Sequence, residues 1–172
     1  MTLRPGLLYF AYGCNMDPDF LAGLTGAGLY PGSPARLDGW RLSFNKGGEG
    51  EGGDQVTANL VEDEGCRTLG VVYRLPREHV AKLDAFEAVP EHYRREMLWV
   101  EPLTRRARQA ALIYVAQPAW IVEPRAPAES YLERLLRGAA IHRLPTSYLD
   151  WLQALARGEA EDCYRGVDSG SD

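Results

Sequence analysis

The stretch Leu-Leu-Tyr-Phe-Ala-Tyr-Gly-Cys-Asn, residues 7–15, is the part of the sequence that predicts the fold most directly. A short apolar and aromatic run of this kind is typical of a buried strand, and Gly13 closes the run with a tight turn. Asp17 and Pro18 then mark the start of a helix, because proline is favoured just inside a helix N-terminus. The chain therefore opens with a predicted strand, turn and helix.

The remainder of the sequence alternates strand and helix signals. We predict strands at residues 35–45 (at least the second half), 56–61, 68–75, 93–100 and 110–116, and helices at residues 76–87, 128–139 and 145–155. A turn is predicted at residues 62–65, and a glycine-rich acidic loop, which would repel a phosphate, at residues 46–54. The 172 residues contain no internal repeat or interdomain linker, so we predict one α+β domain with a mixed or predominantly antiparallel sheet. This domain is predicted to span residues 1–157, and a polar, acidic tail to span residues 158–172.

The charge balance excludes several classes of partner. A net charge of −5 and a pI of about 5.3 disfavour binding to nucleic acid or anionic lipid, which needs a surplus of lysine and arginine. The basic clusters at residues 94–95 and 105–108 are interpreted as an exposed strand end or turn. The apolar run at residues 7–11 is too short for a signal peptide or a membrane span. We therefore expect neither a nucleic-acid nor a membrane partner.

The cysteines and histidines give no sign of a metal site. Cys14, Cys66 and Cys163 are an odd number, lie far apart in the sequence, and form no Cys-x-x-Cys pair. This pattern predicts a reducing, cytoplasmic location. The three histidines share no metal-ligand spacing, so no metal is expected.

Glu87 is the first candidate for chemistry. In the helix predicted from Pro76, a helical period places Glu87 between Val80 and Leu83 in angle, inside the apolar arc. Burial there would raise the pKa of its carboxylate toward neutrality, which suits a general base that later acts as an acid. The alternative is that the helix ends at Phe86 and that Glu87 turns to water or pairs with the arginines at residues 94–95.

The turn at residues 12–15 is the second candidate. It follows a strand and precedes a helix, so its backbone N–H groups are free to bind an anion or an oxyanion. Gly13 would let a ligand approach the backbone closely. Two alternatives are open: an ordinary strand-to-helix turn capped by Asn15, or a nucleophilic Cys14 paired with His79, His92 or His142.

Both candidates coincide with a family pattern. Tyr12-Gly13-Cys14-Asn15 and its preceding strand resemble the opening Tyr-Gly-Ser-Asn segment of the γ-glutamylcyclotransferase family. Leu83-Asp84-Ala85-Phe86-Glu87-Ala88-Val89 resembles that family's Leu-Asp-x-x-Glu-Gly-Val segment, which carries the catalytic glutamate. Cys14 stands where the family usually has serine, and Ala88 where it usually has glycine.

The resemblance implies a fold, an activity and a site. The fold would be a single α+β domain with a mixed or antiparallel, barrel-like sheet flanked by helices. The activity would be that of an acyltransferase: a γ-glutamyl compound cyclises to 5-oxoproline and releases an amine, with Glu87 as acid and base. The implied substrate-binding residues are Tyr9, Phe10, Ala11, Tyr12, Gly13, Cys14, Asn15, Tyr93, Tyr114 and Tyr131. The partner would be a small γ-glutamyl substrate with no metal or organic cofactor, and the sequence is compatible with a homodimer.

The sequence is also compatible with two other functions. The first is a hydrolase or transferase that depends on Cys14 as its nucleophile. The second is a non-catalytic protein of the same fold that binds a small metabolite.

Overall fold

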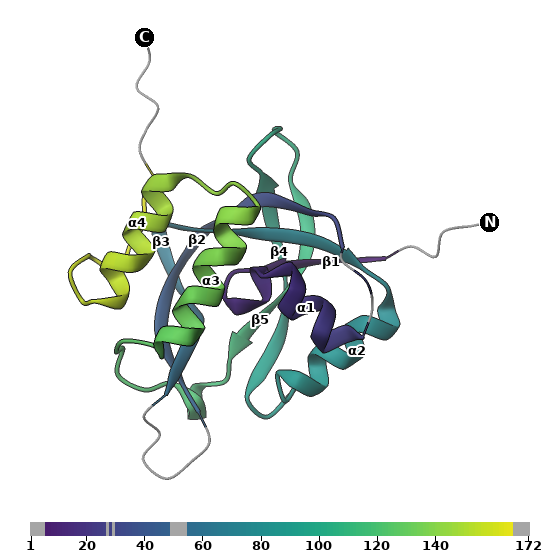
Figure 1. Ribbon diagram of the computed structural model, residues 1–172, viewed down its shortest axis with the longest axis horizontal. Coiled ribbons are helices and arrows are strands. Elements are labelled where there is room, and N and C mark those ends of the chain that lie inside the picture. Colours follow the sequence, from purple (N-terminus) through teal and green to yellow (C-terminus); the bar gives the residue numbers. More distant parts are fainter. Residues whose placement is uncertain (1–5, 27, 29, 49–54, 167–172) are drawn as a thin grey trace.

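The computed structural model describes residues 6–26, 28, 30–48 and 55–166. In chain order the elements are β1 (Leu7–Ala11), the 3-10 helix η1 (Cys14–Met16), α1 (Pro18–Thr25), β2 (Gly32–Gly47), β3 (Val56–Leu75), α2 (Arg77–Phe86), β4 (Tyr93–Pro102), β5 (Gln109–Ala116), the 3-10 helix η2 (Pro118–Trp120), α3 (Glu129–Ile141) and α4 (Thr146–Ala156). The strands form a closed barrel in the order β1-β3-β2-β4-β5 (Figure 1). Strands β1 and β5 pair in parallel, and the other neighbours pair antiparallel. The predicted α+β domain with a mixed, barrel-like sheet is confirmed.

The turn predicted at residues 62–65 is wrong, because β3 continues through it as one strand of 20 residues. The polar Glu-Asp-Glu-Gly segment instead marks a register shift in the pairing with β2, between Asp38 and Trp40. Gly65 has a φ of 93°, so the strand bends there without ending. Pairing with β2 on both sides of the bend keeps the strand intact. Residues 49–54 of the predicted glycine-rich loop lie outside the described residues, and Lys46 and Gly47 belong to β2.

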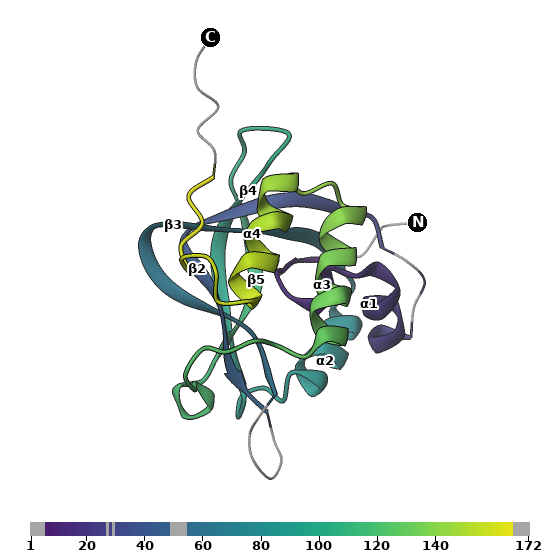
Figure 2. The same cartoon turned by 60° about the vertical axis from the view of Figure 1, so that its left-hand side comes forward.

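Helices cover one side of the barrel, with α3 beside α4 and close to η1 and α1 (Figures 1 and 2). Gly138 of α3 makes this approach possible, since a Cβ atom there would lie 2.3 Å from the backbone carbon of Met16. The Tyr73 hydroxyl donates to the Met16 carbonyl at 2.9 Å from the barrel side. The turn that follows β1 is thus held between the barrel and α3.

The segment after α4 returns to the barrel. Cys163 forms a disulfide with Cys66 of β3, 97 residues earlier in the chain. Tyr164 is buried, and its carbonyl accepts from the backbone N–H of Arg67 at 2.9 Å. Cysteines far apart in sequence therefore meet in space, so their separation along the chain does not show that they are unpaired. Residues 167–172 of the predicted tail lie outside the described residues.

No helix among the described residues has the length and apolar character needed to cross a membrane.

Candidate active site

A cavity of about 280 Å³ opens where β1 runs into its turn. Side chains from most of the elements border it: Tyr9, Tyr12, Gly13, Cys14, Asn15, Phe20, Lys46, Thr57, Ala58, Phe86, Glu87, His92, Tyr93, Tyr114, Tyr131 and Arg134. The two candidates from the sequence, Glu87 and the turn at Gly13, therefore face one cavity.

Glu87 reaches the cavity because the helix before it ends. Helix α2 stops at Phe86, and Glu87 caps it with φ and ψ of −79° and 2°, its N–H donating to the Leu83 carbonyl at 2.8 Å. The helix end at Phe86 matches the alternative interpretation, but the carboxylate does not turn to water. Nor does it pair with the arginines at residues 94–95, which bind Glu96 and Asp84 instead.

The electrostatics of Glu87 suit proton transfer near neutral pH. Burial raises the pKa of its carboxyl to about 7, while the Asn15 hydrogen bond and the positive charge of Lys46 act in the opposite direction. A carboxyl with a pKa near the working pH can both accept and return a proton.

Asn15 connects the turn to Glu87. Its side-chain nitrogen donates to Glu87 Oε1 at 3.1 Å and to the Tyr9 hydroxyl at 2.9 Å. Asn15 is 4% exposed, and burial together with the Glu87 charge raises the pKa of Tyr9. Both protons of the amide are therefore used to hold the carboxylate and its tyrosine neighbour in place.

Four more tyrosines border the cavity: Tyr12, Tyr93, Tyr114 and Tyr131. The Tyr12 hydroxyl donates to the Tyr114 carbonyl at 2.6 Å. The Tyr131 hydroxyl accepts from the backbone N–H of Ala58 at 3.0 Å, and burial raises the pKa of Tyr131, so its own proton is retained. Tyr93 hydrogen-bonds Thr57 at 3.1 Å, and Tyr114 donates to Asp84 at 2.7 Å. Their hydroxyl groups are fixed by neighbours, which gives the cavity polar walls of defined geometry.

Gly13 occupies a position where a side chain would contact Tyr131 too closely. A Cβ atom at this position would lie 2.7 Å from the Tyr131 hydroxyl, so a larger residue would displace that tyrosine. The turn and α3 thus meet at Gly13, on the wall of the cavity.

Phe10 and Ala11 do not border the cavity. Both lie in the core, with exposures of 0% and 1%. Both lie against Gly70, where a Cβ atom would be 2.4 Å from the Ala11 carbonyl oxygen and 2.7 Å from the Phe10 ring. The structure thus brings together the other predicted site residues and leaves these two as packing residues.

Cys14 borders the cavity, but its surroundings keep the thiol protonated. Burial and then the charge of Glu87 raise the pKa of Cys14 to about 12. The three predicted histidine partners have other contacts: His79 contacts Tyr30 and His142 contacts Tyr73, while His92, which borders the same cavity, contacts Lys46. Each feature opposes a role for Cys14 as a nucleophile.

Sequence analysis missed two cations that border the cavity, Lys46 and Arg134. Lys46 is 6% exposed, and its ammonium donates to the Gly47 carbonyl at 2.7 Å and lies 5.3 Å from the centre of the Tyr93 ring. One signal was available, because the apolar residues of the predicted strand alternate at Leu42 and Phe44 and Lys46 is the next residue on that side. Arg134 lies one helical turn after Tyr131 on α3, a spacing that places both on one face.

Metal ligation has no support in the part of the chain that the structure describes. It contains no group of three or more histidine, cysteine, aspartate or glutamate side chains arranged to hold a metal ion.

Comparison with known structures supports the same fold. A structure named γ-glutamyl cyclotransferase superposes with a TM-score of 0.75 at 21% identity, covering 96% of this chain and 92% of that chain. An uncharacterised protein of Homo sapiens gives a TM-score of 0.75 at 20% identity, with 98% and 94% covered. A yeast γ-glutamyl cyclotransferase specific to glutathione gives 0.64 at 15% identity, with 91% and 97% covered. The curated protein sequences give no match.

The family model described as "Gamma-glutamyl cyclotransferase, AIG2-like" matches residues 9–133, a range that holds nearly all of the cavity lining. The chain belongs to the AIG2-like γ-glutamyl cyclotransferase family.

Proposed function

We propose that this protein is a γ-glutamyl cyclotransferase that uses Glu87 as its general acid and base. The observation that carries the proposal is the position of Glu87, a carboxyl with a pKa of about 7 that borders the same small cavity as the turn at Gly13. Family membership supports the class of reaction.

The reaction needs no nucleophile from the protein. The free α-amine of the substrate's glutamyl group attacks its own γ-carbonyl carbon, and a new C–N bond closes a five-membered lactam. The old amide C–N bond breaks, so the products are 5-oxoproline and an amine. Holding the chain folded on itself accounts for much of the acceleration, since oriented intramolecular reactions reach effective molarities of about 10⁵ to 10⁸ M.

Glu87 carries the proton between the two nitrogens. Its carboxylate accepts a proton from the substrate's α-ammonium group, which makes the amine nucleophilic. The resulting carboxyl then donates that proton to the departing nitrogen, so Glu87 ends in its starting form. The attacking nitrogen loses a second proton when the lactam closes, and this proton ends on the released amine, which leaves as an ammonium ion. A positioned acid and base of this kind contributes about 10²- to 10⁴-fold to the rate.

The turn and its tyrosine neighbour support the substrate from the part of the cavity wall that Asn15 joins to Glu87. The backbone N–H groups around Gly13 and Cys14 would hold the oxyanion that forms on the γ-carbonyl oxygen. The Tyr131 hydroxyl lies directly against Gly13 and retains its proton, so it can donate to the same oxygen.

The test is release of 5-oxoproline from a panel of γ-glutamyl dipeptides, γ-glutamyl amines and glutathione. The wild type should release 5-oxoproline from at least one compound, and Glu87→Gln should lower that rate by about 10²-fold or more. Equal rates for the two proteins would remove Glu87 from the mechanism. If no compound yields product, the non-catalytic binding function takes the place of this proposal.

Cys14→Ser separates the proposal from a cysteine-dependent enzyme. A cyclotransferase should keep substantial activity in this variant, because serine is the usual family residue and the thiol forms no bond to substrate. Near-total loss would favour Cys14 as the nucleophile.

A further inference from the structure

The cavity has a buried end and a more exposed rim. Glu87 lies beside Asn15 and Tyr93, which are 4% and 7% exposed. Phe86, by contrast, is 49% exposed and also borders the cavity. Because the substrate's α-amine must reach Glu87, its glutamyl group occupies the buried end. The leaving group, attached to the γ-carbonyl, then extends toward Phe86.

Arg134 lies on this rim with Phe20 and Phe86. Its guanidinium carbon is 4.1 Å from the centre of the Phe20 ring, and the Phe20 and Phe86 rings meet edge to face at 5.8 Å. Stacking on Phe20 leaves the N–H groups at the edge of the guanidinium plane able to bind an anion.

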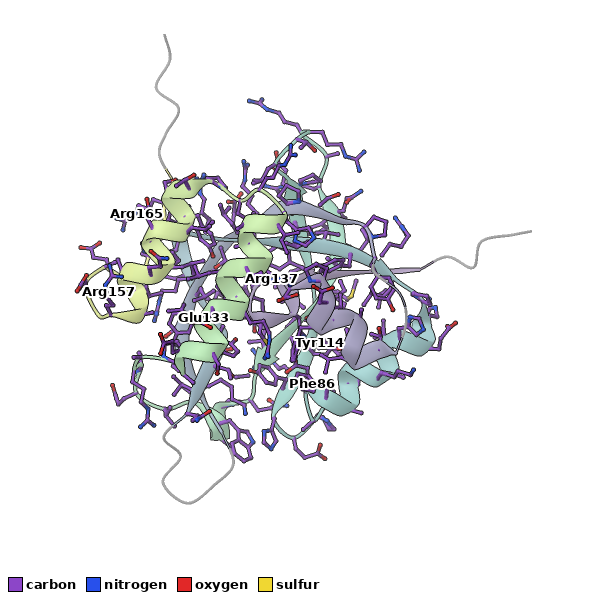
Figure 3. The ribbon with its side chains drawn as sticks, in the orientation of Figure 1. Phe86, Tyr114, Glu133, Arg137, Arg157 and Arg165 are labelled. Carbon is purple, nitrogen blue, oxygen red and sulfur yellow. A yellow bond between two sulfur atoms is a disulfide. The ribbon has the colours of Figure 1, made fainter. Side chains whose placement is uncertain are left out.

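Arg134 and the next arginine on the same helix, Arg137, have different neighbours. Arg137 pairs with Asp17 and Asp19 on the α1 side, and Figure 3 shows it on α3 close to α1. The described residues place no carboxylate within ion-pair distance of Arg134. Its positive charge acts instead on Cys14 in the cavity wall, where it opposes the rise in the thiol pKa.

Arg134 is also held in position. Helix α3 is seated on the turn by Gly138, four residues later, and Tyr131, three residues earlier, is bound to Ala58 of the barrel. The backbone that carries Arg134 is therefore held against the turn and the barrel, and the contact with the Phe20 ring places the guanidinium on the rim.

We infer that Arg134, with Phe20 and Phe86, forms the leaving-group subsite and selects leaving groups that carry a carboxylate. The favoured substrates are then γ-glutamyl amino acids and peptides, rather than γ-glutamyl amines that lack that carboxylate. Guanidinium binds carboxylate through two parallel charge-assisted hydrogen bonds, and the two rings suit the apolar part of a leaving amino acid. This inference rests on the proposed cyclotransferase function.

Two substrates that differ only in that carboxylate test it: γ-glutamyl-alanine and γ-glutamyl-ethylamine. The wild type should show the higher kcat/KM on γ-glutamyl-alanine. Arg134→Gln should lower this value about 10-fold or more and change the value for γ-glutamyl-ethylamine by less than about 2-fold, the size expected for loss of a charge-assisted hydrogen bond. Arg134→Lys should retain part of the preference, because it keeps the charge and loses the bidentate geometry.

Arg157→Gln is the matched control for loss of a positive charge. Arg157 caps α4 and pairs with Glu159, and Figure 3 shows it well away from Phe86. Arg157→Gln should leave kcat/KM unchanged on both substrates. Equal losses on the two substrates in Arg134→Gln would overturn the inference, because Arg134 would then contact the glutamyl group that both share. No loss on either substrate would overturn it as well.

A binding measurement separates this inference from the proposed function. The Glu87→Gln protein, titrated by calorimetry, should bind γ-glutamyl-alanine more tightly than γ-glutamyl-ethylamine, and addition of Arg134→Gln should remove the difference. A preference in binding without 5-oxoproline release from the wild type would reject the proposed reaction and support the subsite. Turnover of both substrates without any preference in binding or rate would support the proposed reaction and reject the subsite.

Discussion

The side-chain amide of Asn15 donates to the carboxylate of Glu87 across 3.1 Å, which joins the turn after β1 to the residue that ends α2. Residues 72 positions apart in the sequence thus form one unit at the cavity. Since a donor favours the ionised form of a carboxyl, this contact holds the pKa of Glu87 below the value that burial alone would give.

Replacing Asn15 should therefore shift the pH dependence of the reaction. In Asn15→Ala the pKa of Glu87 should rise, and the acidic limb of kcat/KM should move to higher pH by about one unit, because a hydrogen bond to a charged group contributes about 1.5 to 3 kcal/mol. The measurement is a pH–rate profile for each protein. An acidic limb that stays in place, with only the maximum lowered, would show that Asn15 does not act through Glu87.

The pKa of Glu87 also predicts how stability changes with pH. Its pKa is raised from 4.5 to about 7 in the folded protein, so between these values the folded state binds more protons than the unfolded state. The contribution of Glu87 to stability is fully present below pH 4.5 and is lost as the pH rises to about 7.

Glu87→Gln should remove this dependence. Across that window the free energy of unfolding of the wild type should fall by about 3 kcal/mol relative to that of the variant. Urea unfolding of both proteins at a series of pH values measures the difference, in which all other titrating groups cancel. A constant difference between the two proteins would show that the pKa of Glu87 is the same in both states.

The order of elements and the position of Glu87 were accessible from sequence because both depend on local pattern. Helical period places Glu87 on the side of Val80 and Leu83, which α2 buries. Since α2 ends before Glu87, the period left two positions open, and the resemblance to the family motif favoured the one in the site. Local pattern failed at residues 62–65, where a polar segment with the composition of a turn belongs to a strand that pairs with β2 before and after it. The secondary structure of that segment therefore depends on contacts with the rest of the barrel.

The cations of the site were accessible from sequence only in part, because spacing gives the face on which each residue lies but does not show that it reaches the cavity. Lys46 reaches the cavity only because the barrel closes, and Arg134 only because Gly138 allows α3 to rest on Met16. Neither residue lies in a segment that resembles a family motif. Their contribution depends on contacts between residues distant in sequence, which periodicity does not report.

The disulfide between Cys66 and Cys163 should stabilise the fold by constraining the unfolded chain. Cys66→Ser should lower the free energy of unfolding by about 2 to 4 kcal/mol under oxidising conditions, the usual effect of a bond that closes a long loop. Dithiothreitol should produce the same loss in the wild type and no further loss in the variant. Cys14→Ser serves as the control and should respond to dithiothreitol as the wild type does, because Cys14 is not part of the bond. Equal stability with and without reductant in the wild type would contradict the prediction.

Ala88, directly after Glu87, has a φ of 48°, a left-handed conformation that glycine adopts without cost. The family's usual glycine at this position is thus explained by the backbone, which must reverse direction as soon as Glu87 has entered the cavity. Ala88→Gly should raise the free energy of unfolding by about 1 kcal/mol, because it relieves the steric cost of Cβ. Ala85→Gly is the matched control, since Ala85 lies inside α2, where glycine should cost about 1 kcal/mol. Opposite signs for two identical substitutions three residues apart, measured by urea unfolding, would establish that Ala88 is strained, whereas a loss of stability in both would show that it is not.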